Sequence, residues 1–125
     1  MAEIPHVTLR DRRALRAAVI EELVRVEAQI TSLARSFDDI VEAAELTSTD
    51  DEHDPEGSTI AFERSQVSSL LAQARSDREQ LRTALQRTDE PGYGACERCG
   101  EFIGVERLLA LPSAVRCISC ARSGW

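Results

Sequence analysis

The sequence predicts a mainly α-helical fold, in which a long antiparallel helical hairpin of the coiled-coil type precedes a small C-terminal module. Two long segments carry apolar residues at helical spacing, a short acidic stretch separates them, and all four cysteines fall within residues 96–120. Only 4% of the 125 residues are aromatic and 30% are charged, which does not favour a thick globular core. We therefore assign residues 1–91 to the hairpin and residues 92–125 to the cysteine-containing module.

The first helix is expected to begin at Thr8 and to continue for about 39 residues. Thr8 can cap the helix, with Asp11 three residues later in the arrangement of a capping box, and Pro5 blocks a helix upstream. Apolar residues then recur at alternating spacings of four and three, which is typical of a coiled-coil seam. These residues are Val19, Leu23, Val26, Ile30, Leu33, Phe37, Ile40 and Ala44.

The second helix is expected to begin at "DPEG", with Asp54 as N-cap and Pro55 in the first helical position, and to end at Arg87 before "DEPGYG". Asp77 and Arg78 interrupt its apolar stripe, which predicts either a loose, hydrated layer or a long side chain lying along the seam. The apolar positions are Ile60, Val67, Leu70, Leu71, Ala74, Leu81, Ala84 and Leu85. Because the two segments match in length, a short connection between them predicts a hairpin.

The connection between the helices forms an acidic tip at about residues 47–57. Asp50, Asp51, Glu52, Asp54 and Glu56 are all acidic within seven positions. Two interpretations stay open for them. They can form a solvated turn whose carboxylates favour the start of the next helix, or an acidic finger presented to a metal ion or a basic channel.

The cysteines form two C-x2-C pairs separated by seventeen residues. Zinc prefers four soft ligands in a tetrahedron, and each pair can bring two thiolates to one ion. Since four thiolates close the coordination shell, the pattern indicates a structural zinc and argues against catalysis by the metal, and we expect a protein that is not an enzyme. We predict that Cys96, Cys99, Cys117 and Cys120 bind one Zn²⁺, and that residues 93–123 unfold without it, because so small a module buries little apolar surface.

Composition excludes several classes of partner. The formal charge of −7 disfavours direct binding to DNA, and no basic helix extends beyond the cysteine pairs. No apolar run approaches the roughly twenty residues of a membrane span, and the N-terminus lacks the apolar segment of a signal peptide. We expect a soluble cytoplasmic protein, and a monomer, because the seam of the hairpin is already paired within the chain.

The order of these parts resembles the DksA/TraR family of RNA polymerase regulators. The resemblance is most specific in the pattern C-x2-C-G-x2-I-G-x3-L-x-A-x-P-x-A-x2-C-x2-C. That pattern is filled by Cys96, Cys99, Gly100, Ile103, Gly104, Leu108, Ala110, Pro112, Ala114, Cys117 and Cys120, preceded by Tyr93 and Gly94. The hairpin agrees with the family in length, order and tip position.

The resemblance implies a transcription regulator that binds RNA polymerase directly and inserts its coiled-coil tip through the secondary channel to modulate initiation. The family tip reads D-x-x-D-x-A, and Asp51, Asp54 and Glu56 stand at that spacing, with Glu56 in the place of alanine. Members that bind the alarmone ppGpp carry basic residues where this chain has Gln80 and Leu111, so the resemblance does not favour ppGpp as an effector.

Arginines surround the cysteine pairs, and their role stays open between two interpretations. Arg98, Arg107 and Arg116 can offset the charge of −2 on a zinc–tetracysteine centre, or they can face the polymerase. For the whole chain, the alternative to a polymerase regulator is a zinc-containing coiled-coil adaptor, or a nucleic-acid-binding protein, without effect on the polymerase.

Overall fold

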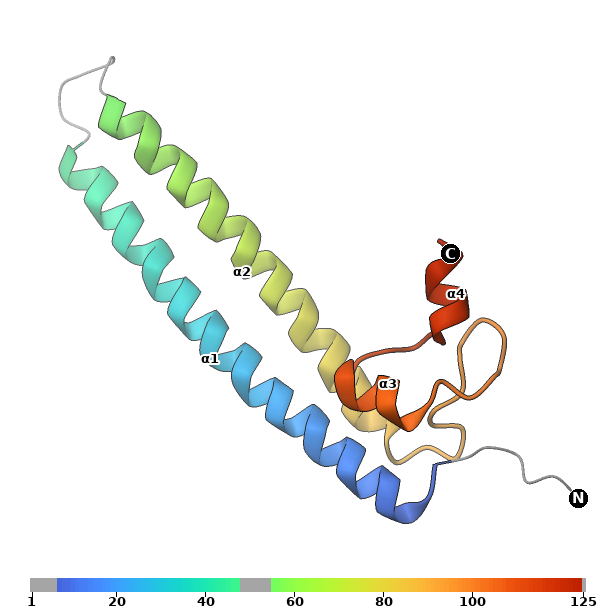
Figure 1. The fold of residues 1–125 in the computed structure, drawn as a ribbon. Coiled ribbons are helices and arrows are strands. Elements are labelled where there is room, and N and C mark those ends of the chain that lie inside the picture. Colours follow the sequence, from blue (N-terminus) through green and yellow to red (C-terminus); the bar gives the residue numbers. More distant parts are fainter. Residues whose placement is uncertain (1–6, 48–54, 125) are drawn as a thin grey trace, which may run out of the picture. The chain divides into compact units, whose positions relative to one another are not determined.

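A computed structural model describes residues 7–47 and 55–124 of the chain. Two long helices, α1 (Leu9–Thr47) and α2 (Pro55–Arg87), are followed by two short ones, α3 (Val105–Ala110) and α4 (Ile118–Arg122) (Figure 1). Within the described ranges, β-structure is limited to one isolated antiparallel bridge between Ala95 and Phe102. The predicted fold class, a helical hairpin with a small C-terminal cysteine module, is confirmed.

The predicted start of the first helix is confirmed, and so are the start of the second helix at Pro55 and its end at Arg87. The backbone N–H of Asp11 donates to Oγ1 of Thr8 at 3.0 Å, so Thr8 satisfies one of the amides that a helix leaves open at its start. Proline is the first residue of α2, where its missing N–H costs no helical hydrogen bond. The proposed N-cap Asp54 lies outside the described residues.

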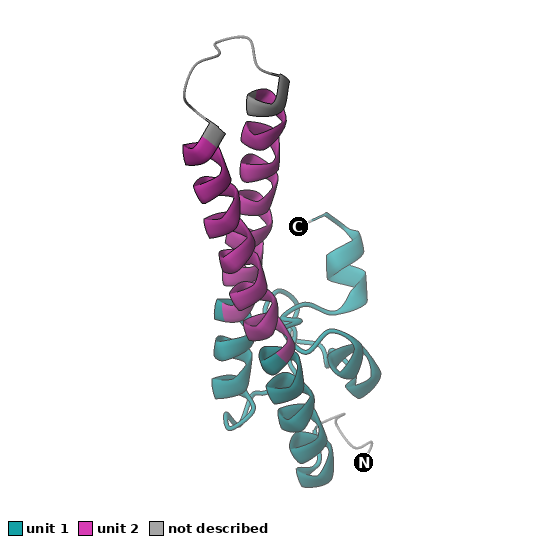
Figure 2. Cartoon of the chain, turned by 90° about the vertical axis from the view of Figure 1, so that its left-hand side faces the viewer, with its two compact units in different colours: residues 1–24, 79–125 teal, residues 25–78 magenta. Residues whose placement is uncertain are grey.

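The chain divides into two compact units (Figure 2). Unit 1 comprises residues 1–24 and 79–125, and unit 2 comprises residues 25–78. Unit 2 holds the end of α1 and the start of α2, whereas unit 1 holds the start of α1, the end of α2 and the cysteine-containing segment. These units are not the two sequence modules, whose boundary at residue 91 stays a prediction.

The coiled-coil seam of α1 is confirmed by burial. Val19, Val26 and Ile30 are at most 9% exposed, and the other five predicted seam residues are half-buried. On α2, Leu71, Ala74, Leu81 and Ala84 are buried in the same way. These small and branched apolar side chains therefore supply the core of the hairpin in both units.

The prediction for Leu70 is wrong, because this side chain is 48% exposed. Buried Leu71 and Ala74, with half-buried Val67, keep the spacing of three and four residues, and Leu70 precedes Leu71 by about 100° around the helix. Arg78 continues the same spacing and is half-buried, which agrees with a long side chain at the interrupted position rather than an empty layer.

Within unit 1, two arginines of α1 donate hydrogen bonds to the residues that directly follow α2. Nη1 of Arg12 donates to the carbonyl oxygens of Thr88 and, at 2.9 Å, of Glu90. Nη1 of Arg16 lies 3.3 Å from both Thr88 Oγ1 and Asp89 Oδ2. Thr88 is fully buried, and carbonyls after the last helical turn have no helical donors of their own. Arg12 supplies donors to these carbonyls from a distant part of the chain, and Arg16 donates to the neighbouring side chains.

We predict that Arg12→Ala lowers the free energy of unfolding by about 1–3 kcal/mol, because it leaves carbonyl groups at the end of α2 without their donor. Urea unfolding followed by circular dichroism at 222 nm measures the effect. Arg13→Ala is the matched control, since Arg13 is the exposed neighbouring arginine on the same helix. Equal stability of the two variants would contradict the role given to Arg12.

Candidate metal centre

The four cysteines of the chain lie together. Their sulfur atoms all fall within 4.8 Å of one another, and Sγ of Cys99 is 3.7 Å from Sγ of Cys117. A tetrahedron of thiolates at a zinc–sulfur distance of about 2.3 Å has edges of about 3.8 Å. Cys96, Cys117 and Cys120 are at most 9% exposed, whereas Cys99 faces solvent. The spacing of the four donors thus fits the coordination shell of a zinc ion.

A tight turn of backbone presents the first pair. The N–H of Cys96 donates to the carbonyl of Glu101 at 2.7 Å, and the N–H of Gly100 donates to the carbonyl of Cys96 at 2.9 Å. Gly100 has a φ of +77°, a conformation that costs a residue with a side chain about 1 kcal/mol or more. This turn points both sulfurs of the pair to the same side.

The second pair uses a helix start instead. Cys117 is the N-cap of α4, and Cys120 lies one turn later in that helix. The N–H of Ala121 donates to the carbonyl of Cys117 at 3.0 Å, which closes the turn between them. Residues three apart on a helix lie on one face, so the helical turn brings these two sulfurs together.

An apolar cluster packs against the cysteines. Leu108 of α3, 1% exposed, and Ile103 share it with Val7 and with Leu15 of α1. The buried cysteines 96, 117 and 120 belong to the same cluster. Three of the four cysteines are therefore packed on the start of the hairpin, and not only on their own short segment.

Gly94 is buried against Val7 and Phe102 of this cluster. A Cβ atom on this residue would lie 2.9 Å from Cγ2 of Val7 and 3.1 Å from Cε2 of Phe102, and its φ is +97°. The N–H of Ile103 donates to the carbonyl of Gly94 at 2.7 Å. Both the available space and the backbone conformation require glycine here.

The electrostatics of the sulfurs favour a cation. The backbone N–H of Cys99 holds the pKa of the Cys96 thiol at about 6, below its usual range. Burial, together with the neighbouring thiols, raises the pKa of Cys120 to about 12. Four negative sulfurs repel one another at this distance, so they ionise together only when a divalent ion compensates their charge.

Three arginines near the cysteines, Arg98, Arg107 and Arg116, have partners within the segment. Nη1 of Arg98 donates to Oγ of Ser123 at 2.6 Å, Nε of Arg107 to the carbonyl of Arg116 at 3.0 Å, and Nε of Arg116 to Oε1 of Glu97 at 3.1 Å. The spacing of the cysteines gives no signal for these contacts. A role of the three arginines in facing a polymerase stays a prediction.

The predicted acidic tip falls largely outside the described residues. Asp51 and Asp54 lie there, and Glu56 lies in the first turn of α2, where the backbone alone is described. Glu63 is the first acidic residue of α2 whose side chain the structure describes, and it is exposed.

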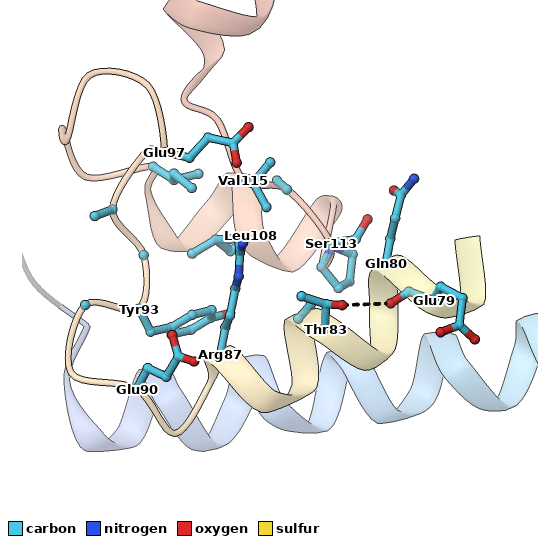
Figure 3. Close-up of a pocket in the computed structure, with 17 residues that line it drawn as sticks. Glu79, Gln80, Thr83, Arg87, Glu90, Tyr93, Glu97, Leu108, Ser113 and Val115 are labelled. Atoms are coloured by element: carbon cyan, nitrogen blue, oxygen red, sulfur yellow. Dashed lines mark hydrogen bonds between the residues drawn. The ribbon is translucent and has the colours of Figure 1, made fainter. Parts of the chain in front are cut away.

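A pocket of about 560 Å³ lies in unit 1, between the last turns of α2 and the segments on either side of α3 (Figure 3). Ile103, Leu108 and Tyr93 give it an apolar wall, and Gln80 and Arg87 line it from α2. Burial raises the pKa of Tyr93, against the lowering effect of the Arg12 guanidinium. A concave apolar wall with a few polar groups is the composition of sites that take small molecules or the side chains of a partner.

In the part of the chain that the structure covers, no helix combines the length and the apolar character that a membrane crossing requires.

Comparisons with known proteins agree on the cysteine segment and on the fold. Residues 91–123 match the prokaryotic dksA/traR C4-type zinc finger family. Over 42 residues, the chain is 40% identical to the RNA polymerase-binding transcription factor DksA of Haemophilus influenzae and 38% identical to that of Escherichia coli K12. These matches cover 34% of this chain, but only 29% and 28% of the two relatives.

The structural comparison extends the likeness to nearly the whole chain. Transcription factor DksA2 of Pseudomonas aeruginosa superposes with a TM-score of 0.78 at 23% sequence identity. The superposition covers 95% of this chain and 86% of that protein. At this identity the likeness shows a shared fold, with the helical hairpin included.

We predict that Gly94→Ala destabilises the zinc-loaded protein by about 2–4 kcal/mol, because the methyl group overlaps Val7 and the backbone is strained. Gly92→Ala is the control. A Cβ at Gly92 meets nothing within 4 Å, so a change of about 0.5 kcal/mol or less is expected. Urea unfolding of both variants measures the difference, and a tolerated Gly94→Ala would refute the close packing.

Proposed function

Because the chain belongs to the DksA/TraR family of C4-type zinc-finger proteins, we propose that it is a transcription regulator that binds RNA polymerase directly. The observation that carries this proposal is the combination of a family-matching zinc finger at residues 91–123 with a hairpin fold shared over 95% of the chain. Neither part alone would be sufficient, since zinc fingers and helical hairpins each serve many functions.

The proposed mechanism is insertion of the hairpin into the polymerase secondary channel. A helix of 39 residues such as α1 is about 58 Å long at 1.5 Å per residue, which suits a rod that reaches a buried catalytic centre. Asp51, Asp54 and Glu56 are the residues that we expect to act there. Carboxylates close to a catalytic magnesium, or to the basic loops around it, change the local electrostatic potential and so the lifetime of the initiation complex.

The remaining assignments follow from the same proposal. The protein acts in the cytoplasm as a monomer, without enzymatic activity and without binding DNA directly, which the formal charge of −7 supports. Gln80 and Leu111 replace the basic residues of ppGpp-binding members, so we propose that ppGpp is not its effector. Arg98, Arg107 and Arg116 remain candidates for polymerase contacts, in addition to their contacts within the chain.

The metal in this proposal is one structural Zn²⁺ per chain, held by Cys96, Cys99, Cys117 and Cys120. When bound, the ion supplies folding free energy to the segment and no chemistry of its own, because four thiolates leave no open coordination position. The residues of the segment then hold the base of the hairpin through the apolar cluster that they share with Leu15.

We predict that the purified protein contains one zinc per chain and that removing zinc unfolds residues 93–123. Acidification should have the same effect. Thiolates bind the ion and protons compete for them, so zinc is retained at neutral pH and lost as the pH falls. A chromogenic zinc assay and circular dichroism follow release and unfolding together. Release without any loss of structure would contradict a structural role.

We predict that the protein is retained on core RNA polymerase and alters initiation in a purified transcription assay. Asp54→Asn and Glu56→Ala should leave retention unchanged and abolish the effect on transcription. Glu63→Gln, which removes an exposed carboxylate farther along α2, is the matched control and should behave as the wild type.

The same assays separate the alternatives. No retention on polymerase would overturn the proposal. Salt-sensitive retardation of duplex DNA would indicate a nucleic-acid-binding protein instead. Capture of other protein partners, with transcription unchanged, would indicate an adaptor.

A further inference from the structure

We propose that Glu97 and Arg98, the two middle residues of the first cysteine pair, hold the second pair in place and thereby slow the loss of the metal. This inference rests on the proposed zinc site and goes beyond it, because neither residue contributes a ligand. It concerns positioning: each of the two side chains reaches across the centre to a residue that flanks the other pair.

Glu97 makes the contact on the N-terminal side of the second pair. Its Oε1 accepts a hydrogen bond from Nε of Arg116 at 3.1 Å, and Arg116 is the residue directly before Cys117. The backbone N–H of Glu97 donates to the carbonyl of Val115 at 2.8 Å. Arg107 of α3 steadies the same place, since its Nε donates to the carbonyl of Arg116 at 3.0 Å. Three separate segments therefore meet at the residue before the third ligand.

Arg98 makes the contact on the C-terminal side. Its Nη1 donates to Oγ of Ser123 at 2.6 Å, and Oγ of Ser123 donates to the carbonyl of Cys120 at 2.8 Å. The relay ends on the backbone of the fourth ligand. Together the two contacts enclose the second pair, one before its first cysteine and one after its last.

This arrangement bears on how a zinc ion would leave. Seventeen residues separate the two pairs, so the pairs can move apart whenever the contacts between them open. A chelator takes the ion once one pair has moved away and coordination positions are free. Contacts between the pairs that do not involve the metal make this opening rarer, as partners of ligand residues do in other metal sites.

The exposure of the Glu97 and Arg116 side chains sets the size of the expected effect on the rate of zinc loss. The side chains of Arg116 and Glu97 are 39% and 43% exposed, so water and salt screen their attraction. An exposed pair of this kind contributes an amount that corresponds to a roughly 2- to 5-fold change in an equilibrium or a rate. Salt should weaken the Glu97 contact, which gives a signature that a purely steric role would not have.

The test measures the rate at which zinc leaves the full-length, zinc-loaded protein in excess chromogenic chelator. Glu97→Gln, Arg98→Met and Ser123→Ala should each release zinc roughly 2 to 5 times faster than the wild type. Glu101→Gln and Arg122→Met are the matched controls, because they remove the same charges from exposed positions in the same segment. Both controls should release zinc at the wild-type rate.

Two further readouts distinguish positioning from general destabilisation. Exchanging the charges, with Glu97→Arg and Arg116→Glu in one protein, should bring the rate back toward that of the wild type. Added salt should speed release from the wild type more than from Glu97→Gln. Rates equal to the controls, or an exchanged pair no better than the single variants, would overturn the inference. A chain that holds no zinc would overturn the zinc site as well, whereas retained zinc with unchanged rates would overturn this inference alone.

Discussion

The packing of the cysteine-containing segment on the start of α1 is the contact on which the rest of unit 1 depends. Leu15 and Leu108, each 1% exposed, lie in one apolar cluster with three of the four cysteines. A segment of about thirty residues buries too little apolar surface to fold alone. The segment buries additional apolar surface by packing against the hairpin, and in the same contact Leu15 of the hairpin is shielded from water.

Polar contacts between α1 and the residues that follow α2 add to that packing. Arg12 and Arg16 reach from α1 to the carbonyls and side chains that follow α2, and the guanidinium of Arg12 lies 5.8 Å from the centre of the Tyr93 ring. One residue therefore contacts the end of α2 and the start of the cysteine-containing segment. Order in that segment and order at the base of the hairpin are thus energetically linked, and the proposed zinc ion would stabilise both.

The sequence contains the signals for most of this fold because those signals are local. The alternating spacing of Val19, Val26 and Ile30, the cap at Thr8 and the proline at residue 55 each act within one or two helical turns. The cysteine spacing likewise predicts the grouping of the four sulfurs. Leu70 was misassigned because both it and Leu71 satisfy an apolar pattern, and only the partner helix decides which of them is buried.

The contacts that the sequence could not predict join residues far apart in the chain. Arg12 and Thr88 are 76 positions apart, and Arg98 and Ser123 are 25 apart. An arginine in an acidic, helical sequence has many possible partners, and no spacing rule selects a carbonyl at the far end of another helix. The arginines around the cysteines illustrate this, because the sequence left their role open between charge compensation and polymerase contact, whereas the structure gives each of the three a specific acceptor.

These features divide the chain by role. The cysteine centre and its apolar support keep the base of the hairpin ordered, and the proposed action on transcription belongs to the far end of the two helices. Site-specific photo-crosslinking from exposed Ser58, near the start of α2, tests this most directly. In complex with core RNA polymerase, the account predicts crosslinks to the lining of the secondary channel. Crosslinks confined to the outer surface of the polymerase, or none at all, would contradict it.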